Sequence, residues 1–157
     1  MLGAERLRQG DELGAIAGDE DVAAAVAAGA LTDPGEAAVL VEQTGAACLA
    51  VSIGNVHGAY REPPQLDWAR LAAIRERVDV PLSLHGASGL PDADVRRAIA
   101  LGVAKVNVNT ELRERYLAAT ADRLPAARPD ARLLELDAAQ VDAVAAAVAA
   151  KLDVYSP

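Results

Sequence analysis

The chain has 157 residues, a formal net charge of −8 and a pI of about 4.7. Its 52% hydrophobic and 24% charged residues are typical of a soluble globular domain and argue against a disordered chain. An acidic chain without a Lys/Arg-rich run is a poor partner for nucleic acid or anionic membranes, and no apolar run is long enough to span a bilayer. Cys48 is the single cysteine, which excludes an intrachain disulfide, so we expect a cytoplasmic protein.

The predicted elements begin with a short strand over 11–16. A helix then starts after Asp33, a residue type that favours the N-cap, with Pro34 at the first helical position and Glu36 at the capping-box spacing. Gly45 is the residue type that most often ends a helix, so this helix is expected to stop just before it.

Three more strand and helix pairs follow along the chain. Strands are expected over 48–54, 80–86 and 104–109, and the first of them is a continuous apolar run, which indicates a strand that is buried on both faces of a parallel sheet. Because the chain has no Phe, the core must consist of Val, Leu, Ile and Ala. Asp67 and Thr110 are expected to cap the helices after the first and third of these strands, and Pro91-Asp92 opens the helix after the second. A last helix covers roughly 137–152.

Strands that alternate with helices imply parallel pairing and right-handed crossovers, so the fold class is α/β. Two architectures fit this order equally well. One is an open doubly wound sheet, and the other is part of a (β/α)8 barrel, which needs roughly 250 residues when complete. The spacing of the elements does not separate them.

Polar and glycine-rich residues follow each predicted strand, which marks the catalytic face of an α/β protein. His57 and His85 are the two histidines of the chain, and each lies at or just past a strand end and is followed by glycine. Adjacent parallel strands would bring the two imidazoles together, which indicates a shared metal, with zinc favoured. The alternative is a pair of loop histidines with ordinary hydrogen bonds.

The HGASG segment from His85 to Gly89 is a glycine-rich turn before a helix, where backbone N–H groups can hold phosphate. Thr110 offers the same chemistry at the start of the next helix. In the alternative interpretation, Gly86 and Gly89 only permit positive φ in tight turns.

Glu12, Asp19 and Glu20 form an acidic group near the start of the chain. A carboxylate near zinc could be a ligand or a proton shuttle, whereas the simpler interpretation is a solvated acidic loop. Tyr60 and Trp68 are interpreted as packing residues rather than functional ones.

Taken together, the segments SIGNVHG, LHGASG and VNVNTEL resemble the class II aldolases of the fructose- and tagatose-bisphosphate type. The resemblance runs from about Gly10 to Arg113. It implies the C-terminal half, about four βα units with strands 5–8, of a TIM (β/α)8 barrel, as a single partial domain over 1–157. It also implies a lyase of glycolysis and carbohydrate metabolism. The expected reaction is the zinc-dependent, reversible aldol cleavage of a ketose bisphosphate to dihydroxyacetone phosphate and an aldehyde.

The resemblance also assigns roles to individual residues, although Gly10 stands where many members carry a glutamate. His57 and His85 correspond to two of three zinc-binding histidines, and Glu12 to a glutamate close to the metal. Glu20 corresponds to a loop glutamate that moves protons, and Asn107 to an asparagine near the reacting carbons. Substrate and phosphate contacts are implied for Gly58, Gly86, Ala87, Ser88, Asn107, Val108, Asn109 and Thr110.

The third zinc histidine and a neighbouring aspartate belong to the N-terminal half of the family's barrel, which we expect this chain to lack. We therefore expect the isolated chain to be inactive or very weak, and to act as a homo-oligomer or after completion by its missing half. Two alternatives remain open: a non-catalytic half-barrel that binds phosphate ligands or a second chain, and an open-sheet phosphosugar-binding domain unrelated to zinc.

Overall fold

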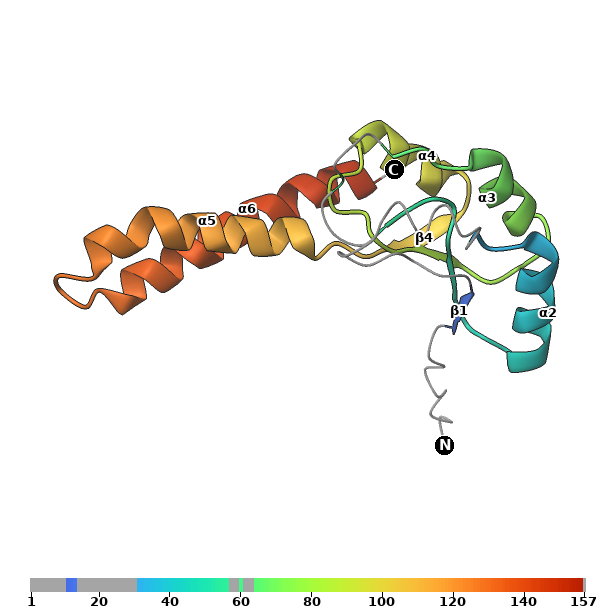
Figure 1. The fold of residues 1–157 in the computed structure, drawn as a ribbon, viewed down its shortest axis with the longest axis horizontal. Coiled ribbons are helices and arrows are strands. Elements are labelled where there is room, and N and C mark those ends of the chain that lie inside the picture. Colours follow the sequence, from blue (N-terminus) through green and yellow to red (C-terminus); the bar gives the residue numbers. More distant parts are fainter. Residues whose placement is uncertain (1–10, 14–30, 57–59, 61–63, 157) are drawn as a thin grey trace. The chain divides into compact units, whose positions relative to one another are not determined.

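The computed structural model describes residues 11–13, 31–56, 60 and 64–156, with the backbone alone described for 11–13 (Figure 1). It consists of two compact units, Met1–Asn107 and Val108–Pro157, which are considered separately below. Among the described residues, the first contains a sheet with three helices, and the second contains two long helices. We refer to them as the sheet unit and the hairpin unit.

The sheet unit contains four parallel strands whose order in the sheet is their order in the chain. They are β1 (Asp11–Leu13), β2 (Leu49–Val51), β3 (Leu82–Leu84) and β4 (Val103–Val106). β2, β3 and β4 each end before the end of the range predicted for them, because the polar and glycine residues that follow each strand lie in turns and loops. A described helix lies between each pair of successive strands, so the α/β architecture with parallel pairing is confirmed.

Two aspartate caps define the helices that flank the sheet. The first helix, α2 (Pro34–Thr44), begins after Asp33, which accepts hydrogen bonds from the second and third amides of the helix at 2.7 and 3.0 Å. It ends at Gly45 in the left-handed conformation, with φ of 63°. Asp67 caps α3 (Trp68–Arg75) by accepting a bond from the third amide at 2.9 Å. The predicted caps and the predicted stop are therefore confirmed.

The core of the sheet unit is built from the aliphatic residues that the composition required. Leu49, Val51, Leu82 and Leu84 are fully buried on one face of the central strands. Helices contribute further fully buried side chains, Leu71 and Ile74 from α3, and Val95 from α4 (Asp92–Ala100). The alternate residues of β2 and β3 are buried as well, which is usual in parallel sheets.

The edge strand β4 differs from the two central strands. Ala104 and Lys105 are exposed, and a register irregularity lies opposite Leu82 and Ser83 of β3. In the sheet as described, β4 pairs with β3 on one side only. This edge is the feature expected of a sheet that is one part of a larger barrel.

The hairpin unit consists of α5 (Thr110–Ala127) and α6 (Leu133–Tyr155), which run side by side in opposite directions (Figure 1). Two side-chain contacts fix their register: Lys151 pairs with Glu111 at 2.9 Å, and Gln140 donates to Thr120 at 2.8 Å. Two predictions about this region were wrong. Thr110 is the first helical residue and not the cap, and the last helix extends well beyond 137–152 because its Ala-rich sequence propagates a helix in both directions.

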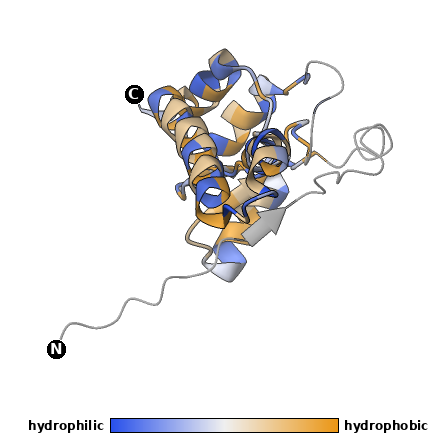
Figure 2. Cartoon of the chain, turned by 90° about the vertical axis from the view of Figure 1, so that its left-hand side faces the viewer, coloured by the Kyte–Doolittle hydropathy of each residue, from blue (hydrophilic) through white to orange (hydrophobic). Residues whose placement is uncertain are grey.

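Both hairpin helices carry apolar and polar residues along their surfaces (Figure 2). Large apolar side chains are exposed on both, including Leu117 at 62% on α5 and Leu134 at 83% on α6. The buried apolar residues described in the hairpin are few, namely Ala127, Leu136 and Val154. Although α6 is long, no helix among the described residues combines the length and apolar character needed to cross a membrane.

Candidate functional site

The residues after β3 and β4 continue the sheet beyond the ends of the strands. The amide of Asn107 donates to the Leu84 carbonyl at 2.9 Å, and the amide of Ala87 donates to the Asn107 carbonyl at 3.2 Å. These two bonds join the HGASG loop to the end of β4. The structure therefore brings Gly86, Ala87, Ser88 and Asn107 together at one edge of the sheet, as the sequence predicted.

The HGASG loop is a tight turn with two glycines at positive φ. Gly86 has φ of 63° and Gly89 has φ of 82°, both in a region that favours glycine. Ala87 is fully buried and Ser88 is 5% exposed. The turn closes when the Leu90 amide donates to the Ala87 carbonyl at 3.2 Å, and α4 begins two residues later. The glycines have positive φ, and the loop lies before a helix. A tight-turn role for the glycines and a phosphate-binding role for the loop are therefore compatible.

Asn107 is oriented by its neighbour on β4. Lys105 Nζ donates to Asn107 Oδ1 at 2.8 Å, and residues two apart on a strand share a face. In this exposed bond, Oδ1 points toward the ammonium group. Lys105 sits opposite Ser83 in the sheet, whose hydroxyl is buried and has no hydrogen-bond partner among the described residues.

Asn55 is a structural residue at the carboxyl ends of the strands, and its role was not predicted from the sequence. Its side chain is almost completely buried, at 2% exposure. Oδ1 accepts from the Ile53 amide at 2.8 Å, while Nδ2 donates to the Val51 carbonyl at 3.3 Å and to the His85 carbonyl at 3.2 Å. The sequence signal for Asn55 was a side-chain amide that follows an apolar strand and precedes a histidine.

Tyr60 is the second missed residue, and its interpretation as packing alone was incomplete. Its hydroxyl accepts from the Val56 amide at 3.1 Å and donates to the Gly86 carbonyl at 3.0 Å. Burial raises the pKa of this hydroxyl, and the hydrogen bond from Val56 opposes the shift in part. The side chain thus remains a protonated donor to the loop at neutral pH.

The predicted metal residues are only partly within the described chain. His57, Gly58 and Glu20 lie outside the described residues, and Glu12 is described as a backbone position in β1, paired with Ala50. His85 follows β3 directly and is half-buried. Within residues 31–56, 60 and 64–156, no group of three or more His, Cys, Asp or Glu side chains could hold a metal ion. Zinc binding at these positions stays a prediction.

The remaining predicted substrate residues open the hairpin unit. Val108 is its first residue, Asn109 occupies the N-cap position of α5, and Thr110 is the first residue of the helix. Asn109 makes no side-chain capping bond to α5. These three residues follow Asn107 directly in the chain, and their substrate contacts stay a prediction.

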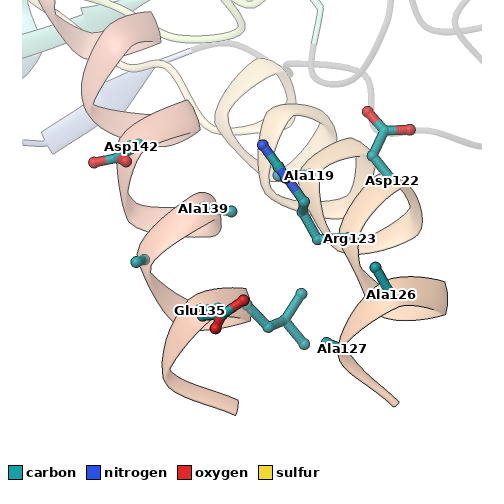
Figure 3. A pocket seen from close by; sticks show the side chains of 10 residues that line it. Ala119, Asp122, Arg123, Ala126, Ala127, Glu135, Ala139 and Asp142 are labelled. Carbon is teal, nitrogen blue, oxygen red and sulfur yellow. The ribbon is translucent and has the colours of Figure 1, made fainter. Parts of the chain in front are cut away.

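A separate groove of about 520 Å³ lies within the hairpin unit, between α5 and α6 (Figure 3). Figure 3 shows Asp122 and Arg123 on α5, with Glu135 and Asp142 on α6. None of the predicted site residues lines it. Its lining consists of Ala119, Asp122, Arg123, Ala126, Ala127, Glu135, Leu136, Ala138, Ala139 and Asp142.

The parallel strands follow one another in the sheet in chain order, and polar groups gather at their carboxyl ends. This arrangement is that of one half of a (β/α)8 barrel with its active-site face. Comparison with known sequences agrees, because residues 11–156 match the family profile described as fructose-bisphosphate aldolase class-II. The chain belongs to the class II fructose-bisphosphate aldolase family.

Solved structures show the same relationship. The chain is similar to a putative fructose-1,6-biphosphate aldolase from Coccidioides immitis, with 35% identity and a TM-score of 0.79 over 92% of this chain and 50% of that one. It is also similar to the YdjI aldolase from Escherichia coli K12, with 39% identity and a TM-score of 0.69 over 80% of this chain and 44% of that one. The fructose-bisphosphate aldolase (Fba) from Campylobacter jejuni shares the fold at 18% identity, with a TM-score of 0.63 over 79% of this chain and 45% of that one. The chain thus spans about half the length of these proteins.

Proposed function

We propose that this chain carries part of the metal- and phosphate-binding face of a zinc-dependent ketose-bisphosphate aldolase of the fructose-bisphosphate type. The reaction would be the reversible cleavage of a ketose bisphosphate to dihydroxyacetone phosphate and an aldehyde, in the cytoplasm. The observation that carries the proposal is the bonded edge formed by the HGASG loop and Asn107, at the carboxyl ends of β3 and β4. Active sites of (β/α)8 barrels lie at this end of the strands.

The phosphate group would bind at the HGASG loop. Its amides precede the N-terminus of α4, where N–H groups and the helix dipole favour an anion. The Ala87 amide already donates to Asn107. We expect Gly86 and Ser88 to contribute phosphate contacts from this loop together with Ala87. Val108, Asn109 and Thr110 would complete the substrate contacts from the next segment.

The donor chemistry of the site fits zinc, because imidazole is among its preferred ligands, but the set is incomplete in this chain. His57 and His85 would hold the ion with Glu12 close to it, and a third protein ligand would come from elsewhere. Zinc would supply Lewis acidity toward the substrate carbonyl. The amide of Asn107, oriented by Lys105, would contact the substrate near its reacting carbons, and the carboxylate of Glu20 would accept and return a proton.

Activity on this proposal requires the rest of a barrel. The exposed Ala104 and Lys105 on β4 support this requirement, because strands of parallel sheets are normally covered on both faces. The other four strands would come from the N-terminal half of a barrel or from another subunit. The isolated chain is expected to be inactive or very weak.

The test is aldol cleavage of fructose 1,6-bisphosphate by the protein purified in its native assembly. We expect activity to fall to background with a metal chelator and to return with Zn²⁺, and we expect His85→Ala to abolish both zinc retention and turnover. Cys48→Ala serves as the control variant, because this partly exposed residue directly precedes the amino end of β2, whereas the candidate site lies at the carboxyl ends of the strands. Cleavage that survives the chelator would overturn the proposal.

A second candidate function is a non-catalytic half-barrel that binds phosphate ligands or associates with a second chain. The bonded loop after β3 favours it, since this loop is complete within one unit of the chain. Measurable affinity for dihydroxyacetone phosphate, with no cleavage in the native assembly, would favour this alternative over the enzyme.

A further inference from the structure

We propose that Asn55 and Tyr60 form a clamp that positions the HGASG loop for a phosphate-bearing ligand, an inference that rests on the proposed function. Neither side chain is assigned a contact with substrate. Both hold backbone carbonyl groups of the loop after β3, and both come from the loop after β2. They are positioning residues, and they lie on either side of the segment that contains His57.

Tyr60 spans the loop from one glycine to the other. Its hydroxyl donates to the Gly86 carbonyl at 3.0 Å, while the edge of its ring lies 3.6 Å from the position that a Cβ on Gly89 would occupy. The same hydroxyl accepts from the Val56 amide at 3.1 Å. A single side chain therefore ties one positive-φ position of the turn, Gly86, to the backbone after β2, and its ring lies beside the other, Gly89.

Asn55 holds the residue before the turn. Its Nδ2 donates to the His85 carbonyl at 3.2 Å and to the Val51 carbonyl at 3.3 Å, and these carbonyls lie at or just past the ends of β3 and β2. At 2% exposure the amide is shielded from water, so losing a partner would leave a buried polar group unsatisfied. Such a group is strongly oriented by its surroundings.

The two bonds at the Gly86–Ala87 peptide explain how the clamp sets the loop. The carbonyl of this peptide accepts from Tyr60, and its N–H donates to the Asn107 carbonyl at 3.2 Å. Because the carbonyl and N–H of a trans peptide point in opposite directions, the peptide plane is held from the β2 side and from the β4 side at once. The direction of the amides of Ser88 and Gly89, which follow in the chain, depends on this plane.

The test compares Tyr60→Phe with Tyr116→Phe in the full chain. Tyr116 is 46% exposed on α5, so its substitution removes a hydroxyl without touching the loop. Inorganic phosphate and dihydroxyacetone phosphate are the probes, with affinity measured by NMR titration. We expect Tyr60→Phe to weaken both affinities roughly two- to tenfold, the effect of one lost hydrogen bond, and we expect no change from Tyr116→Phe.

A second readout separates positioning from a general loss of structure. Hydrogen exchange at the Ala87 amide should accelerate in Tyr60→Phe by a similar factor. Tyr60 does not bond to this N–H, which points away from the carbonyl that Tyr60 holds and donates to Asn107. Fluorescence of Trp68, the single tryptophan, should show a folded sheet unit. Should the variant unfold, the ring signals of Tyr60 in the unmutated protein must shift on phosphate addition, and unmoved signals overturn the clamp.

The outcomes distinguish the clamp from the function beneath it. If the unmutated protein binds phosphate and Tyr60→Phe binds it equally well, the clamp is overturned and the proposed phosphate site stands. If the unmutated protein binds neither probe, the phosphate site fails and the positioning role falls with it. Weaker binding together with faster Ala87 exchange, in a folded variant, supports the clamp.

Discussion

The sheet unit and the hairpin unit are stabilised in different ways. In the sheet unit, the apolar residues of the central strands are completely buried, and hydrogen bonds continue past the strand ends into the loops. In the hairpin unit, α5 and α6 contact one another through a narrow seam and expose large apolar side chains such as Leu134. The first unit has an interior, whereas the second is a pair of long helices with little of one.

This difference explains where the candidate chemistry lies. The HGASG loop keeps two positive-φ glycines in place because it is hydrogen-bonded to Asn55 and Tyr60 after β2 and to the Asn107 carbonyl after β4. A backbone conformation that is held from several directions can present polar groups at fixed positions. The hairpin has few such constraints, and its groove is lined by surface residues of two helices.

The largest expected effect comes from truncating one leucine in each unit. Leu84→Ala removes a fully buried side chain of β3 and should destabilise the sheet unit by about 2–5 kcal/mol. Leu134→Ala, at 83% exposure, should change stability by less than about 0.5 kcal/mol. Denaturant unfolding followed by Trp68 fluorescence measures the first, and far-UV circular dichroism measures the second. Equal effects would mean that the two units do not differ as described.

A glycine pair tests the backbone of the sheet unit. Gly54 has φ of 102°, and a Cβ there would lie 2.6 Å from the carbonyl oxygen of Gln65, so Gly54→Ala should cost about 1–3 kcal/mol or more. Gly35 lies in the first turn of α2, where a Cβ would meet only the Asp33 side chain at 3.1 Å, and Gly35→Ala should be near neutral. Trp68 fluorescence in urea is the measurement, and a neutral Gly54→Ala would contradict the described loop after β2.

The hairpin offers a smaller effect at a part-buried side-chain hydrogen bond between its two helices. Gln140 is 6% exposed and donates to Thr120 at 2.8 Å, so Gln140→Ala should destabilise the hairpin by about 1 kcal/mol. Gln43→Ala, on the exposed surface of α2, is the matched control. Hydrogen exchange of α6 amides should increase in the first variant alone. If Trp68 fluorescence moved as well, unfolding of the two units would be coupled.

The sequence predicted the local structure of the sheet unit well because its signals are local. Asp33, Gly45 and Asp67 act through bonds to residues within four positions, so their types alone indicate the helix ends. The gathering of the HGASG loop with Asn107 was also predictable, because parallel strands end at one edge.

The missed features depend on contacts between distant residues. The bond from Tyr60 to the Gly86 carbonyl spans 26 positions, and that from Asn55 to the His85 carbonyl spans 30. No periodicity or motif encodes a side-chain bond to a backbone carbonyl at such separation. The length of α6 was underestimated for a different reason, since Leu133 and Leu134 start the helix without a side-chain capping bond.

The smallest expected effect is the difference between the two units in how their stability responds to acid. The pKa of Asp33 is lowered chiefly by the amide of Glu36 and then by that of Gly35, and the pKa of Asp67 is lowered chiefly by the amide of Arg70. A carboxylate with a lowered folded-state pKa stabilises the fold above its unfolded value of 3.8 and loses this contribution as pH falls through the folded-state pKa. The contribution is minor because both carboxylates are exposed to solvent. Neither α5 nor α6 has a side-chain capping bond, so the hairpin should lack this component.

The double variant Asp33→Asn, Asp67→Asn isolates the effect, because asparagine caps a helix about as well as aspartate but does not titrate. At pH 6 its sheet unit should be almost as stable as the unmutated one. Between pH 4 and pH 2, amides at the starts of α2 and α3 should lose protection in the unmutated protein more than in the variant, while amides at the start of α6 respond equally in both. Because the charged caps lie only in the sheet unit, an equal acid response of α2 and α6 would show that the two units are not stabilised differently at their helix ends.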